Sequence, residues 1–179
     1  RVGLLLFADR VVKLVPPRKG SRHALRLLRD ILVHGETATV GGITDRAGAL
    51  HALSRILHRR TMVLLVSDFA DPDESRLLER IATRHDLTAI VPHDPWERAL
   101  PDVGLIRVRD PESGREEILD TSDARFRADY EARSLARADA LRQRARAAEI
   151  DWIEVDTCGE HLETLRRHFD RRRHSQAQG

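Results

Sequence analysis

The stretch VLLVSDFAD, residues 63–71, carries the main sequence evidence for the fold. Its apolar run, Val63 to Val66, is typical of a strand buried inside a sheet, and the run ends abruptly on Ser67 and Asp68. Ligands of open α/β sheets bind at the carboxyl ends of the strands, so Asp68 is a candidate binding residue. The alternative is that Ser67 and Asp68 cap the helix that follows. This stretch alone does not separate the two interpretations.

Other apolar runs and helical patterns alternate along the chain. Strands are expected at 2–8, 11–15, 62–66, 87–91 and 151–157, with a hairpin formed by 103–110 and 115–120. The strand 11–15 is expected to be an antiparallel edge strand that Pro16 and Pro17 stop. The alternation of strands with helices indicates an α/β fold. We expect a Rossmann-like, mostly parallel sheet with helices on both faces.

The helices are recognised by their apolar stripes. Ser21 is a plausible first residue of a helix that carries Leu25, Leu28 and Leu32 on one face and ends at Gly35. A second helix follows the loop at 36–45, a short one follows Pro72, and residues 92–101 hold at most one helical turn. Longer helices are expected at about 123–149 and 160–172.

Composition limits the classes of function. The chain is 41% hydrophobic, which suits one domain with a core, and we expect a single domain over residues 1–174 with a frayed tail at 175–179. Basic and acidic residues nearly balance, at 31 against 29, which argues against a dedicated nucleic-acid surface. The single cysteine, Cys158, excludes an internal disulfide and fits a reducing compartment, so a cytoplasmic location is expected. No apolar run reaches the roughly 18–20 residues of a membrane helix.

The loop GGITD, residues 41–45, adds a second candidate ligand. It places the Thr44 hydroxyl just before an amphipathic helix, after two glycines that permit a close approach. Thr44 and Asp68 both offer oxygen at strand–helix junctions, and Mg²⁺ accepts a few protein oxygens while it keeps several waters. The pair therefore makes a plausible half of a Mg²⁺ site. Capping of the helix is the alternative role for Thr44, although Asp45 can form that cap instead.

Several segments together resemble a known family. The first is FADR, which lies between the first two expected strands. The others are VPPRKGSRHALRLLRDIL, GGITDRAGAL, VLLVSDFAD, HDPWERALP, ILDTSDARFRADYEAR and IDWIEVDTCGEHLETLRRHFDRRR. In this order and spacing they resemble the von Willebrand factor A-like domain of bacterial proteins in domain-of-unknown-function family fifty-eight. The resemblance covers nearly the whole chain.

The resemblance implies a metal-ion-dependent adhesion site with three parts. Thr44 matches its threonine loop and Asp68 its aspartate loop, with Asp45, Ser67 and Asp71 as supporting residues. The first part, Asp-x-Ser-x-Ser, lies in the family on a strand upstream of residues 1–9, between strands 2–8 and 62–66. The chain opens on Arg1 and not on Met, so we expect this N-terminal strand to be missing and Mg²⁺ to bind weakly.

Two functions remain open at this point. The first is a protein-binding module that captures an acidic side chain through a metal. The resemblance implies a MoxR-type AAA+ ATPase as its partner, in protein maturation or complex assembly. The alternative is a Mg²⁺-dependent hydrolase or phosphotransferase that uses Asp68, which needs a base or nucleophile beside that residue. We favour the binding module, because no histidine is placed obviously to activate Ser67.

Overall fold

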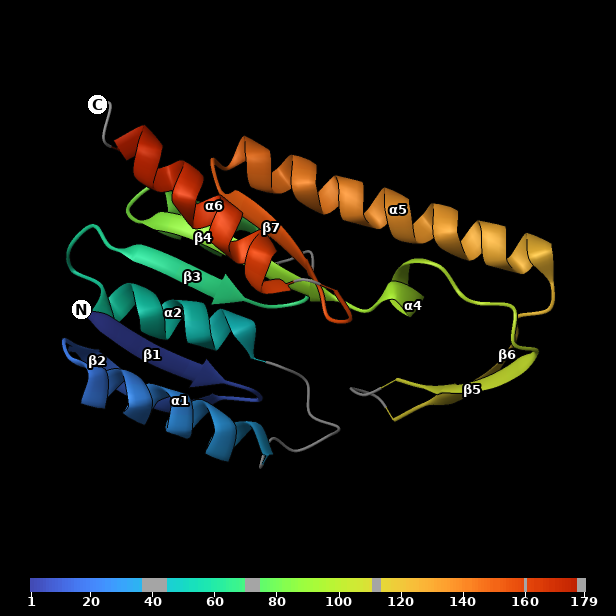
Figure 1. The fold of residues 1–179 in the computed structure, drawn as a ribbon, viewed down its shortest axis with the longest axis horizontal. Coiled ribbons are helices and arrows are strands. Elements are labelled where there is room, and N and C mark those ends of the chain that lie inside the picture. The colour runs from blue at the N-terminus through green and yellow to red at the C-terminus, as the bar shows by residue number, and fades with distance from the viewer. Residues whose placement is uncertain (37–44, 70–74, 111–113, 160, 177–179) are drawn as a thin grey trace. The chain divides into compact units, whose positions relative to one another are not determined.

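The chain forms two compact units in a computed structural model, which describes residues 1–176 except 37–44, 70–74, 111–113 and 160 (Figure 1). The smaller unit comprises residues 1–58 and 107–118, and the larger comprises 59–106 and 119–179. The expectation of a single domain over residues 1–174 stays a prediction.

A three-stranded parallel sheet forms the centre of the larger unit. Its strands are β3 (Met62–Val66), β4 (Asp86–His93) and β7 (Asp151–Asp156), in the order β3-β4-β7. The register pairs β4 with β3 along Asp86–Ile90 and with β7 along Thr88–His93, so the central strand has a parallel neighbour on each side. The expected α/β class with parallel strands is therefore confirmed for this unit.

Helices cover both faces of this sheet, as the alternation of side chains along β4 shows. Leu87 and Ala89 line a pocket together with residues of α3 (Ser75–Ala82) and α5 (Ala124–Ala147). Thr88 points to the other face, where its hydroxyl accepts a hydrogen bond from Arg172 of α6 (His161–Gln176). The larger unit therefore has three layers, with α3 and α5 on one side of the sheet and α6 on the other.

Two shorter elements lie between β4 and α5 in the chain. The turn of helix α4 (Pro95–Arg98) begins at Asp94, whose carboxylate accepts from the Trp96 amide while the Glu97 side chain reaches back to the Asp94 amide. A hairpin of β5 (Leu105–Arg109) and β6 (Glu116–Asp120) follows, as the sequence predicts. Asp123 then caps α5 by accepting from the amides of its first turn.

The smaller unit is built on an antiparallel strand pair. Strand β1 (Val2–Phe7) pairs with β2 (Val11–Arg18), and helices α1 (Ser21–Glu36) and α2 (Arg46–Ile56) contact the pair. The expectation that Pro16 and Pro17 stop the second strand is wrong. An edge strand tolerates prolines wherever its amides do not face a neighbour, and β2 continues through both to Arg18.

Two further expectations for the smaller unit are wrong. In α1, the predicted inward residues Leu25 and Leu32 are 65% and 68% exposed, whereas Leu27 is only 6% exposed. Leucines surround much of this helix, so their spacing does not single out one face. The helix also includes Gly35 rather than ending there.

One arginine side chain, that of Arg172, fastens α6 to the start of the sheet. Arg172 lies between the first residues of two strands: it pairs with the Asp86 carboxylate, lies 2.8 Å from the Asp151 carboxylate and donates to the Thr88 hydroxyl at 3.0 Å. The Arg172 side chain is 20% exposed and Thr88 is completely buried. Because Thr88 is buried and the Arg172 and Asp86 side chains are largely shielded from water, these contacts contribute more than fully exposed ion pairs do.

Replacing Arg172 tests this attachment. In Arg172→Met the stem still packs but the charged contacts are lost, so we expect the free energy of unfolding to fall by about 1–3 kcal/mol. The amides of α6 should also exchange with deuterium faster. The matched control is Arg167→Met, which removes only an exposed pair with Glu163 and should change stability little. Equal loss in both variants would contradict the assigned role of Arg172.

Candidate functional site

The residues after β3 form the carboxyl edge of the parallel sheet. The Ser67 amide donates to the Ile90 carbonyl at 3.1 Å, so β3 stays aligned with β4 up to this residue. Asp68 follows and is exposed, while Phe69 turns back and is buried. The structure therefore places the Asp68 carboxylate at the end of a sheet strand and in contact with solvent.

A local hydrogen-bonded turn holds Ser67 and Asp68. The Phe69 amide donates to the Ser67 hydroxyl at 3.2 Å, and that hydroxyl donates to the Asp68 carboxylate at 3.4 Å. Ser67 therefore touches Asp68, and its supporting role at a metal stays a prediction. A hydroxyl that bridges an amide and a carboxylate in this way is typical of a local turn.

Asp68 opens onto a cavity of about 330 Å³. One face of α5 contributes Tyr130 and Arg137 to the cavity lining, and Glu97 of α4 and Trp152 of β7 also line it. A volume of this size lies in the range of ligand sites in proteins. The cavity combines aromatic surface with charges of both signs, so it suits a polar partner group more than an apolar molecule.

A carboxylate with several partners holds one side of this cavity in place. Glu154 of β7 accepts from Arg142 of α5 at 2.9 Å and from the Trp152 indole at 3.0 Å, and it also pairs with Arg98 of α4. These hydrogen bonds, with Arg142 first, lower the pKa of Glu154 from 4.5 to about 2. Glu154 is thus ionised and ties α4 and α5 to the sheet.

The contact between α4 and α5 is reinforced at the cavity wall. The Ser134 hydroxyl donates to the Glu97 carbonyl at 2.7 Å. Burial and then the nearby Glu97 carboxylate raise the pKa of Tyr130. The phenol therefore stays protonated near pH 7 and offers a neutral hydrogen-bond donor to a partner group in the cavity.

The structure describes some of the predicted site residues and not others. Ser67 and Asp68 lie together in the larger unit. Asp45 belongs to the smaller unit, where its carboxylate accepts from the Gly48 amide at 2.8 Å and caps α2. Thr44 and Asp71 lie outside the described residues. The pairing of Thr44 with Asp68 therefore stays a prediction.

The donor chemistry around Asp68 fits one part of a Mg²⁺ site. The Asp68 carboxylate and the Ser67 hydroxyl supply the hard oxygen atoms that Mg²⁺ prefers. Across the described parts of the chain, no group of three or more His, Cys, Asp or Glu residues could hold a metal ion. That Thr44 supplies a further ligand stays a prediction, because Thr44 lies outside the described residues. The ion would supply a positive charge that attracts an acidic partner group.

Sequence reasoning missed the group around Glu154. The pattern DWIEVD carries a usable signal, because Trp152 and Glu154 alternate onto one face of the strand. A carboxylate on a strand face that a helix covers requires a cationic partner, and α5 is rich in arginine. The pattern does not reveal which arginine pairs with Glu154, since that depends on how α5 crosses β7.

The chain belongs to a protein family whose function is not described. The model of the family "Protein of unknown function DUF58" matches residues 1–140. The chain is 38% identical over 146 residues to uncharacterized protein Rv1480 of Mycobacterium tuberculosis, a match that covers 79% of this chain and 45% of that protein. It is 36% identical over 154 residues to uncharacterized protein MAV169 of Mycobacterium avium, covering 85% of this chain and 83% of that protein.

The chain thus spans about half the length of Rv1480 and of the matching proteins of Mycobacterium bovis and a second Mycobacterium tuberculosis strain. No solved structure matches it. Within the parts of the chain that the structure describes, every helix is too short or too polar to span a bilayer.

The Glu154 group predicts a pH dependence of stability. The pKa of Glu154 is lower in the folded protein than the ordinary 4.5, so its contribution is complete above that pH and is lost as pH falls toward about 2. Glu154→Gln should lower the free energy of unfolding at pH 7 by about 1–2 kcal/mol and flatten its fall between those pH values. Denaturant unfolding across pH measures both effects. Glu131→Gln, at an exposed position on α5, is the control that should leave the pH profile unchanged.

Proposed function

We propose that this chain is a protein-binding module with a partial metal-ion-dependent adhesion site. In this proposal Asp68 is one ligand of a Mg²⁺ ion, Thr44 is the second, and waters fill the remaining positions. An acidic side chain of a partner protein displaces one of these waters and binds the ion. Ser67, Asp45 and Asp71 support the two loops.

The observation that carries this proposal is the position of Asp68. It follows a strand aligned with the central strand of a parallel sheet, and it opens onto a cavity of about 330 Å³. Ligands of α/β sheets collect at this edge, where side chains are held by rigid strands and still meet solvent. A carboxylate so placed suits cation-assisted binding better than it suits a capping role alone.

The proposed partner is a MoxR-type AAA+ ATPase, with a task in protein maturation or complex assembly in the cytoplasm. The support for this part is the family to which the chain belongs and the resemblance in its motifs. The hydrolase or phosphotransferase alternative needs a base beside Ser67 or Asp68. The bonds of the Ser67 hydroxyl to the Phe69 amide and the Asp68 carboxylate favour binding without chemistry.

We also propose a von Willebrand factor A-like fold in which a further strand pairs with the outer edge of β3. Among the described residues, β3 pairs with β4 alone. Met62, Leu64 and Val66 alternate along β3 and are exposed, although apolar side chains at such positions are typical of a strand covered on both faces. A strand added at this edge would cover backbone groups of β3 that β4 leaves unpaired.

Cation binding tests the proposed site. Because two protein ligands leave most of the coordination shell to water, residues 1–179 should bind Mg²⁺ only weakly by calorimetry. In NMR titrations with Mg²⁺, the amides of residues 67–69 should shift, and Asp68→Asn should abolish these shifts. Asp129→Asn on the exposed face of α5 is the matched control and should preserve them. Micromolar affinity, or shifts that persist in Asp68→Asn, would count against the proposal.

A further inference from the structure

Phe69, directly after the proposed ligand Asp68, has an unusual backbone conformation. Its φ angle is +51°, in the left-handed region that glycine adopts readily and that a bulky side chain disfavours. Such strain persists only where the surroundings enforce it, and strained residues cluster at functional sites. A glycine would adopt this conformation without strain, so the phenylalanine side chain must contribute something that a glycine cannot.

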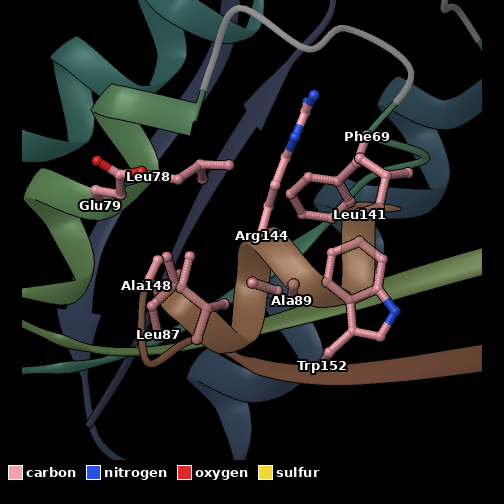
Figure 2. Close-up of a pocket in the computed structure, with 11 residues that line it drawn as sticks. Phe69, Leu78, Glu79, Leu87, Ala89, Leu141, Arg144, Ala148 and Trp152 are labelled. Carbon is pink, nitrogen blue, oxygen red and sulfur yellow. The ribbon is translucent and has the colours of Figure 1, made fainter. Parts of the chain in front are cut away.

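The Phe69 ring supplies that reason, because it is an anchor in the core. The residue is 5% exposed, and its ring centroid lies 5.2 Å from that of Trp152, with an angle of 48° between the planes. Figure 2 shows the ring at an apolar pocket lined by Leu78, Leu87 and Ala89 among others. Burial of an aromatic ring against a second ring outweighs the cost of one left-handed residue. Glycine would remove the strain and the anchor together.

The anchor fixes Asp68 from one side while the sheet fixes it from the other. On the N-terminal side, the Ser67 amide continues the pairing with Ile90. On the C-terminal side, the buried ring holds the Phe69 backbone, whose amide donates to the Ser67 hydroxyl. The Asp68 backbone between two such fixed points has little freedom, so the point from which its side chain projects is set. That side chain lines the cavity.

We propose that Phe69 is a positioning residue, whose buried ring and left-handed backbone aim the Asp68 carboxylate at its cation. This inference rests on the proposed function of Asp68 as a metal ligand. Phe69 itself touches neither the cation nor the partner. It restricts the conformational freedom of Asp68 before the cation binds, so less freedom is lost on binding. The site therefore binds the cation more strongly than a site with an aspartate in an ordinary loop would.

Paramagnetic broadening by Mn²⁺ measures this effect even at a weak site. Mn²⁺ is added to the wild-type protein and to four variants, and broadening of the amides at residues 67–69 is followed by NMR. In Phe69→Ala the half-maximal Mn²⁺ concentration should rise about tenfold or more, as is usual when a residue that orients a ligand is removed. Phe69→Leu keeps an apolar anchor and should restore most of the affinity. Leu78→Ala opens the same pocket from α3 and should lower stability without changing Mn²⁺ binding.

The outcomes separate this inference from the proposed function. Equal weakening in Phe69→Ala and Leu78→Ala, or no weakening in Phe69→Ala, would overturn the positioning role, because the ring would then act only in the core. Asp68→Asn reports on the function itself. If Asp68→Asn leaves the broadening intact, the metal site is wrong. If it abolishes broadening while Phe69→Ala does not, only the role of Phe69 is wrong.

Discussion

Parallel pairing on both sides of β4 is the constraint on which the larger unit depends. Residues at the centre of this strand are almost inaccessible, with Thr88 at 0% and Ala89 at 1% exposure. A strand paired on both edges and covered on both faces has no freedom to shift, because a slip of one residue would exchange its two faces. The alignment of β3 with β4 places Asp68 at the carboxyl edge. The alignment of β7 with β4 places Trp152 beside Ala89 and thus sets the surface against which Phe69 packs.

Arginine contacts complement a core that has few aromatic residues. Only 4% of the chain is aromatic and 34% is charged, so helices cannot be held by large rings alone. At the carboxyl edge Glu154 joins arginines of α4 and α5, and at the opposite edge Arg172 joins α6 to the first residues of β4 and β7. These groups are partly shielded from water, which makes them more effective than exposed pairs. The Glu154 group fixes α4 and α5, which contribute to the cavity wall, and so connects the fold to the site.

Much of the sheet was predictable from sequence, because its strands are short apolar runs between charged or turn-forming residues. The strand at 62–66 and the position of Asp68 at its end follow from VLLVSDFAD alone. The inward face of α1 did not follow, since its leucines occupy more than one face and the burial of Leu27 depends on how the helix packs. The left-handed backbone of Phe69 and the partners of Glu154 depend on side chains distant in sequence. No local pattern encodes such contacts. The pairing of Thr44 with Asp68 stays a prediction.

The most direct test of the central claim is a crystal structure of this chain with Mn²⁺, analysed by anomalous diffraction. The account predicts a Mn²⁺ peak about 2–2.5 Å from an Asp68 carboxylate oxygen, with the Thr44 hydroxyl on the same edge of the sheet and bound to the ion directly or through one water. A high Mn²⁺ concentration in the crystal compensates for weak affinity. A structure with Thr44 and Asp68 on opposite faces of the sheet, or with Mn²⁺ bound elsewhere and none at Asp68, would contradict the account.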